Sequence, residues 1–322
     1  MLMQSKSPAL LSINYNYLFL NNIFGDVMRV WYTAVLCVAF FAAGPVWSQE
    51  RFSIFVGSNP ESIDRMVAIA GLRDGDVVTD LGSGDGRIVI SAVKSHPGVS
   101  GWGVDIDEKL VRESSAEAGK EGLSGRVRFF HQNAFDADLS QANVIFMWLW
   151  PELMYMLRTK ILAEARPGTR VVTNMWDLGS WKPDATDDRP MPVHMWVVPA
   201  QVRGSWNWEL TVGGVKRHYA AVLEQQFQQI EGVVRAGDRR GVFREMKLRG
   251  EDLSFALDIT LDGSGMFRHT FNVKVRGDQM LGTVRIVPLK RDDEAGEAVT
   301  LPFQATRNPK SAYFAPTGLV KR

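Results

Sequence analysis

The chain has 322 residues, 45% hydrophobic and 23% charged, which is ordinary for a globular protein and long enough for two domains. Its formal net charge of +1 gives no reason to expect a nucleic-acid partner. The single cysteine, Cys37, excludes a disulfide within the chain, and none of the five histidines stands at metal-ligand spacing from another histidine or a cysteine, so no metal site is predicted.

The first segment is predicted to be an export or anchoring signal. Arg29 precedes an almost wholly apolar run over residues 30–44, and small residues follow up to Ser48. This order is typical of a cleaved secretory signal, and the alternative is a short membrane anchor formed by residues 30–47. We therefore expect residues 1–48 to be an extension that leaves the body exported (periplasmic or extracellular) or membrane-anchored, with a cytoplasmic location left open.

From residue 60 to residue 174, strand patterns alternate with helix patterns. Helices are predicted over Pro60–Ala70, Arg87–Lys94, Glu108–Glu121 and Pro151–Ala165. Strands are predicted over Val77–Leu81, Gly101–Ile106, Val127–His131, Asn143–Leu149 and Arg170–Asn174. Such alternation predicts an α/β fold, a doubly wound and mostly parallel sheet with helices on both faces, which we assign to residues 49–200.

After residue 193 the pattern changes to short strands separated by glycine turns. They are predicted over His194–Pro199, Trp206–Val212, Tyr219–Gln229, Glu231–Ala236, Gly241–Arg249, Leu253–Thr260, Phe267–Val275, Met280–Val287 and Val299–Ala305. Many short strands with regular turns predict a small all-β antiparallel meander, either a barrel or a sandwich. We assign this second domain to residues 201–322.

The turn after the first strand of the α/β domain carries the strongest functional signal. Residues 80–87 read DLGSGDGR, a strand that enters a glycine turn and then a helix, as in nucleotide cradles. The dinucleotide fingerprint requires a third glycine where Arg87 stands. Asp80 and Asp85 would repel a pyrophosphate and attract a sulfonium and an ammonium group. The sequence therefore predicts S-adenosylmethionine rather than NAD, held by Asp80, Gly82, Ser83, Gly84 and Gly86.

Two further strand ends add to this predicted cofactor site. Asp105 follows the glycine turn by roughly 20 residues, where an acidic side chain reaches ribose hydroxyls, and Ile106 can pack on adenine. Asn133 and Ala134 follow the third strand, and Asn133 can accept a hydrogen bond from the adenine amino group. Each residue has a simpler interpretation, such as a helix cap at Asp105 or Asp107 and a loop cap at Asn133. Their order along the chain favours the cofactor site.

The methyl-acceptor side is less well marked, and the sequence identifies no general base. Trp148 and Trp150 share one face if the fourth strand continues to residue 149, and their rings can contact a cation. Glu152 and Asp177 can orient an amine. The alternatives are that the tryptophans pack in the core and that Glu152 is an ordinary first-turn helix acid.

Residues 80–90 resemble the first motif of the mitochondrial ATP-synthase c-subunit lysine N-methyltransferase family and its bacterial relatives, which are class I S-adenosylmethionine-dependent methyltransferases. Residues 104–107 and 143–162 follow the same pattern, so the resemblance covers residues 54–200, and the chain is more distantly similar to seven-strand histone-lysine methyltransferases. The family's aromatic-Val-Pro-Ser/Thr motif appears here as residues 55–58 (FVGS).

This resemblance implies methyl transfer from S-adenosylmethionine to a protein lysine as the methyl acceptor. Two alternatives stay open. One is a methyltransferase acting on a small molecule or lipid gripped by the β meander, which the mitochondrial members lack. The other is a non-catalytic exported binding protein.

Overall fold

The chain was analysed as a computed structural model that describes residues 59–289 and 296–308. It divides into two units, Met1–Glu50 and Arg51–Arg322, and all described residues belong to the second. The predicted export or anchor segment and the motif at residues 55–58 lie outside the described residues. Within the described ranges, no helix combines the length and apolar character needed to cross a membrane.

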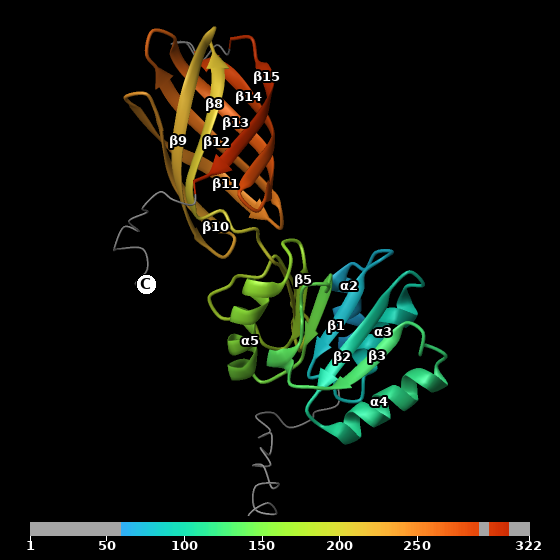
Figure 1. Ribbon diagram of the computed structural model, residues 1–322. Helices are drawn as coiled ribbons and strands as arrows, with labels where there is room; N and C mark the ends of the chain where they lie inside the picture. The colour runs from blue at the N-terminus through green and yellow to red at the C-terminus, as the bar shows by residue number, and fades with distance from the viewer. Residues whose placement is uncertain (1–58, 290–295, 309–322) are drawn as a thin grey trace, which may run out of the picture. The chain divides into compact units, whose positions relative to one another are not determined.

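The first half of the described chain forms a seven-stranded sheet in the order β3-β2-β1-β4-β5-β7-β6 (Figure 1). The strands are β1 (Val77–Leu81), β2 (Ser100–Asp105), β3 (Val127–His131), β4 (Val144–Met147), β5 (Arg170–Asn174), β6 (Ala185–Asp187) and β7 (Val193–Val197). The first five are parallel, whereas β7 is antiparallel to β5 and β6. This confirms the predicted doubly wound, mostly parallel sheet. Strand order reverses between β1 and β4, the place where such sheets bind ligands.

Helices cover both faces of this sheet (Figure 1). Helices α2 (Pro60–Ala70), α3 (Arg87–Ser95) and α4 (Glu108–Lys120) pack into one core cluster, and α5 (Pro151–Glu164) packs into the other. The start of α2 follows from its sequence, since Asn59 caps the Glu61 N–H and Pro60 occupies the first turn. We call the side covered by α2, α3 and α4 the α2 face.

The end of β4 differs from the prediction. The strand stops at Met147 rather than Leu149, and Trp150 is the N-cap residue of α5. The apolar run Trp148-Leu149-Trp150 imitates a longer strand, but the helix that begins at Pro151 requires the chain to turn first. The alternation that would have placed Trp148 and Trp150 on one strand face therefore does not apply.

The second half of the described chain forms a closed eight-stranded antiparallel barrel in the order β10-β11-β12-β13-β14-β15-β8-β9 (Figure 1). Its strands are β8 (Gly204–Val212), β9 (Val215–Gln226), β10 (Gln229–Ala236), β11 (Arg239–Arg249), β12 (Asp252–Leu261), β13 (Gly265–Arg276), β14 (Gln279–Leu289) and β15 (Val299–Arg307). This confirms the predicted meander and shows it to be a barrel, except that the first strand of the predicted series, His194–Pro199, is β7 of the seven-stranded sheet. Most strands are longer than predicted because tight turns let pairing continue to the turn itself, as in Val212↔Val215.

Candidate functional site

The glycine turn after β1 is held against the neighbouring strand β2. Gly82 and Ser83 both donate their backbone N–H to the carbonyl of Val104, at 2.9 and 2.8 Å. Gly82, Gly84 and Gly86 have φ of 86°, 53° and 81°. These are left-handed values that glycine adopts without strain. A Cβ on Gly86 would also lie against Phe129 and 2.7 Å from the Ser114 Cβ. The turn therefore needs glycine here for both conformation and space.

Asp105 organises this turn from the end of β2. Its Oδ2 accepts the Gly84 N–H at 2.8 Å, and its Oδ1 accepts the Asp107 N–H at 2.8 Å. The residue predicted to bind ribose is thus also the residue that fixes the glycine turn. The helix cap is Asp107 and not Asp105, because Asp107 precedes α4 and accepts the Lys109 N–H.

Asp80 is the most unusual group at this edge of the sheet. It is 1% exposed, and among the described residues its Oδ1 has no hydrogen-bond partner. Burial raises the pKa of its carboxyl well above the ordinary value, and the negative charges of Asp105 and Asp85 raise it further. A buried carboxylate without compensation costs free energy, so this position favours a ligand that brings positive charge. The adjacent Thr79 and Ser83 hydroxyls are likewise buried and unpartnered within the described ranges.

Asp85, the second acidic residue of the turn, is paired within the chain. Both of its carboxylate oxygens accept hydrogen bonds from the Arg87 guanidinium, with Nε at 2.8 and 2.9 Å. The Arg87 charge therefore offsets that of Asp85. The negative charge available to a ligand comes from Asp80, with Asp105 beside it.

The predicted adenine contacts lie beside the end of β2. Asn133 accepts the Phe135 N–H at 3.0 Å and so caps the short 3-10 helix η1 (Ala134–Asp136), which begins at Ala134. The Ile106 carbonyl is 3.1 Å from the His131 ring. Asn133 therefore acts as a loop cap in the structure. Its contact with adenine stays a prediction, and that contact would involve the same side-chain oxygen.

The four predicted acceptor-side residues are spread along two loops. Trp148 is half-buried and packs on the core beneath the α2 face, whereas Trp150 is 45% exposed. Glu152 is exposed in the first turn of α5, and Asp177 accepts the Gly179 N–H in the loop after β5. Among the described residues, no hydrogen bond or ion pair joins these four side chains to one another, and their role at the acceptor stays a prediction.

The sequence reading missed the residues that end β5. Asn174 is fully buried, and neither its side-chain oxygen nor its side-chain nitrogen has a partner in the described part of the chain. Met175 has φ of 70°, rare for a residue other than glycine, and the Trp176 N–H donates to the Asn174 carbonyl at 2.8 Å across it. In the sequence, an asparagine at a strand end indicates only a turn. The complete burial of Asn174, which marks it as a candidate site residue, appears only in the structure.

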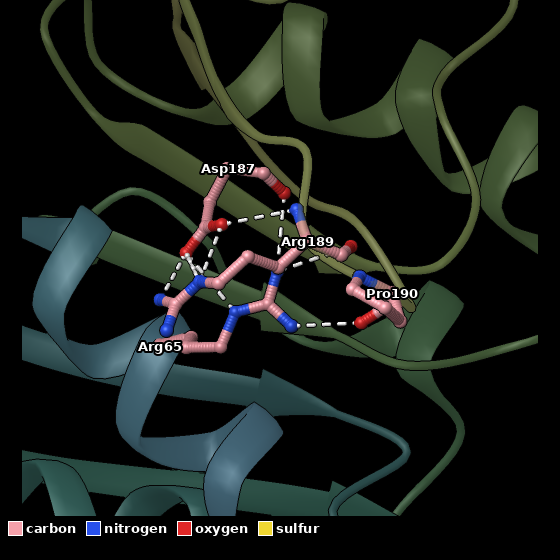
Figure 2. Close-up of polar contacts among 4 residues, drawn as sticks. All are labelled: Arg65, Asp187, Arg189 and Pro190. Atoms are coloured by element: carbon pink, nitrogen blue, oxygen red, sulfur yellow. Dashed lines mark hydrogen bonds and ion pairs between the residues drawn. The ribbon is translucent and has the colours of Figure 1, made fainter.

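An arginine clamp supports this end of the sheet (Figure 2). Arg65 of α2 is 5% exposed and bonds Asp187 Oδ2 at 3.0 Å, the Asp187 carbonyl at 3.1 Å and the Pro190 carbonyl at 2.9 Å. Arg189 and Arg65 together hold the pKa of the Asp187 carboxyl far below its ordinary value. The clamped segment continues to Pro192, whose carbonyl accepts the Met175 N–H at 2.7 Å.

The domain that carries this glycine turn is similar to known methyltransferases. Residues 80–185 match the model of the ANTKMT methyltransferase domain. A protein-lysine N-methyltransferase of Saccharolobus islandicus is 37% identical over 129 residues, which are 40% of this chain and 80% of that protein. The human ATP synthase c-subunit lysine N-methyltransferase is 32% identical over 130 residues, 40% of this chain and 54% of that protein.

Among solved structures, an RNA methyltransferase from Salinibacter ruber in complex with S-adenosyl-L-homocysteine is 38% identical. The match covers 46% of this chain and 96% of that chain, with a TM-score of 0.44. The chain thus spans most of the archaeal relative but only about half of the human one, and the family model ends before the barrel strands begin.

Proposed function

Because the chain belongs to the family of S-adenosylmethionine-dependent methyltransferases that includes the Saccharolobus islandicus enzyme, we propose that it methylates lysine side chains of a protein. The choice of lysine rests on that enzyme's activity and on the matching activities of the mammalian relatives on the ATP synthase c-subunit and the adenine nucleotide translocase.

The observation that carries the proposal is the buried, uncompensated carboxylate of Asp80 beside the glycine turn. Its place in the switch-point crevice suits the ammonium group of the cofactor, directly or through water. Asp105 suits the ribose hydroxyls, and the backbone of Gly82, Gly84 and Gly86 permits close approach. A phosphate-linked cofactor would meet the Asp80 charge instead.

The protein's contribution to the reaction is mainly positioning and removal of water. S-adenosylmethionine supplies the methyl carbon: the amine nitrogen forms the N–C bond while the C–S bond breaks with its electron pair passing to sulfur, and a proton of the nitrogen leaves to water. A lysine ammonium must first lose a proton to become a nucleophile. Trp150, Met175 and Trp176 are exposed apolar side chains in the loops after β4 and β5, and desolvation by them lowers the pKa of an incoming lysine.

The test is a transfer assay with methyl-labelled S-adenosylmethionine and separated protein, lipid and RNA fractions of a bacterial extract. We expect label in the protein fraction and its recovery as methyllysine after acid hydrolysis. Label confined to the lipid or RNA fraction would contradict the proposal, as would no transfer at saturating donor.

An Asp105→Ala variant is the matched control for the cofactor site. It removes the acceptor of the Gly84 N–H as well as the predicted ribose contact. We expect it to transfer no label and to lose S-adenosylhomocysteine affinity by calorimetry. Unchanged affinity would count against the ribose role.

We also propose that residues 28–48 export or anchor the protein, from their order of one cation, an apolar run and small residues. S-adenosylmethionine is made in the cytoplasm, so the location of the folded body decides how the cofactor reaches it. The test is to fuse reporter enzymes after Gln49 and to measure whether they are active inside or outside the cell. Activity only inside the cell would contradict export. They would leave the proposed methyl transfer intact.

A further inference from the structure

The side-chain amide of Asn174 is buried, but it makes no hydrogen bond with the described residues. Its side chain is 0% exposed, and both its oxygen and its nitrogen lack partners among the described residues. Leaving a buried amide unpaired costs free energy, so native proteins rarely keep one without a purpose. The matched case in the same sheet is Asn143, at the amino end of β4, whose Oδ1 accepts the Val77 N–H at 2.9 Å.

The register places Asn174 at the edge of the sheet that holds the glycine turn. Phe146 of β4 pairs with Asp80 on one side and with Val172 on the other. Asn174 stands two residues beyond Val172, as Gly82 stands two beyond Asp80. Because side chains alternate along a strand, Asn174 points to the same face as Val172 and Asp80, the α2 face.

The order of strands assigns Asn174 to the acceptor rather than to the cofactor. The predicted ribose group, Asp105, lies on β2, and Asp80 lies on β1. Strand β5 lies on the opposite side of β1, beyond β4. At about 4.8 Å between neighbouring strands, the backbone of Asn174 is roughly 10 Å from that of Gly82. With the nucleoside of the cofactor bound at the end of β2 and its methionine group at the end of β1, the end of β5 is free for the group that receives the methyl.

The backbone around Asn174 is held in a strained shape. The turn at Met175 is fixed by three hydrogen bonds: Trp176 N–H to the Asn174 carbonyl, Met175 N–H to the Pro192 carbonyl, and the Thr173 hydroxyl to the Trp176 carbonyl at 2.6 Å. A positive φ at methionine persists only when its surroundings over-determine it, and such strain clusters at functional sites. The turn fixes where the strand ends and therefore where the Asn174 amide lies.

We propose that the Asn174 side chain binds the amine that accepts the methyl group, with its Oδ1 accepting an N–H of the uncharged amine. The remaining lone pair of the nitrogen is then free to attack the methyl carbon. The inference rests on the proposed methyl transfer and adds to it the residue that orients the acceptor. It makes Asn174 a residue kept at a cost to stability.

The test compares Asn174→Leu, which keeps the branched shape and removes the amide, with Asn174→Asp and with Asn143→Leu. We expect Asn174→Leu to lower the initial rate of label transfer to the protein fraction by roughly tenfold to a hundredfold, the effect of losing one or two hydrogen bonds. Its dissociation constant for S-adenosylhomocysteine should stay within about twofold of the wild-type value, since the cofactor groups lie on β1 and β2. Asn174→Asp keeps an acceptor oxygen and should retain part of the rate.

Stability separates this role from a structural one. Without cofactor, Asn174→Leu should unfold at the same urea concentration as the wild-type protein or a higher one. Asn143→Leu should unfold at a lower concentration, because the Val77 N–H loses its partner. A wild-type rate of label transfer by Asn174→Leu, or a stability loss like that of Asn143→Leu, would overturn the inference.

Variants are compared on total label transferred to the protein fraction. Label on a residue other than lysine would therefore refute the proposed function and still test Asn174. No transfer by the wild-type protein would overturn both.

Discussion

Asp80 shows how one side chain can oppose the stability of its own fold. Its carboxyl is buried beside Asp105 and near Asp85, and the described residues supply no cation to Asp80 itself. A group whose pKa is raised by folding stabilises the protein only while it stays protonated. That stability is full below the unfolded pKa, about 3.9, and is lost as the pH rises through the folded value.

We predict that Asp80→Asn raises the free energy of unfolding of the cofactor-free protein at neutral pH by about 1–3 kcal/mol, because it keeps the shape and removes a carboxyl that must take up a proton or bury its charge on folding. The two proteins should converge in urea unfolding as the pH falls toward 4. Equal stability at pH 7 would show that the Asp80 charge is compensated.

Binding of a ligand with an ammonium group should also draw the Asp80 proton off. Calorimetry of S-adenosylhomocysteine binding in two buffers of different ionisation enthalpy should reveal proton release by the wild-type protein. The Asp80→Asn variant should show none, together with weaker affinity.

At the scale of elements, Gly86 of the glycine turn between β1 and α3 can be compared with Gly75, which lies in the turn before β1. Gly75 and Gly86 have nearly the same φ, 83° and 81°, but a Cβ on Gly75 would meet nothing within 4 Å. Gly75→Ala should cost about 1–2 kcal/mol, the price of a left-handed alanine. Gly86→Ala should cost about 1–3 kcal/mol more, because the methyl group overlaps Phe129 and Ser114. Urea unfolding measures both, and only Gly86→Ala should also weaken cofactor binding.

The arginine clamp tests how α2 supports the edge beyond β5. Arg65 and Arg189 both bond Asp187, but Arg65 is 5% exposed and Arg189 is 60% exposed. Arg65→Ala should lower the free energy of unfolding by about 2–4 kcal/mol, because it empties a buried position and removes the hydrogen bonds of the guanidinium to Asp187 and Pro190. Arg189→Ala should lower the free energy of unfolding much less, because the ion pair of an exposed arginine contributes little. Equal effects in urea unfolding would mean that burial of Arg65 adds nothing.

How much of these elements the sequence predicts depends on how local their causes are. The start of α2 and the glycine turn depend on adjacent residues such as Asn59, Pro60 and Gly86, and their positions are predicted correctly. The prediction for the end of β4 is wrong because the apolar run continues through Trp148, Leu149 and Trp150 although pairing stops at Met147; Leu149 is buried, but Trp150 is exposed. Strand β6 was not predicted, since its three residues are partly exposed and its pairing with β7 is a tertiary contact.

The candidate site divides in the same way. Motif residues such as Asp80 and Asp105 are visible because spacing along the chain defines them. Asn174 and Met175 are not, because burial and a positive φ are imposed by the surrounding structure. Closure of the barrel was equally beyond the sequence, since it depends on the pairing of β15 with β8 about 100 residues away, as in Thr306↔Asn207.

At the scale of the molecule, the two sheets should respond to acid in opposite directions. His269 lies inside the barrel, 0% exposed, with its Nε2 3.2 Å from the Tyr219 hydroxyl. Burial lowers the pKa of His269 to about 4. In the unfolded chain its pKa is about 6.5. The unfolded state therefore gains the proton first, and the barrel loses stability between pH 6.5 and pH 4, by about 3 kcal/mol in all.

As the pH falls, the methyltransferase domain gains stability from Asp80, offset in part by His194, a less buried histidine whose pKa burial also lowers. We therefore predict that at pH 4.5 the barrel unfolds at lower urea than the sheet of β1–β7, although one transition covers both at pH 7. Circular dichroism should show strand signal lost before helix signal. His269→Phe should remove the early transition, because it fills the same aromatic core without a titrating group. His218→Phe, on the exposed face of β9, is the control that should keep it, and an early transition that survives in His269→Phe would place its cause elsewhere.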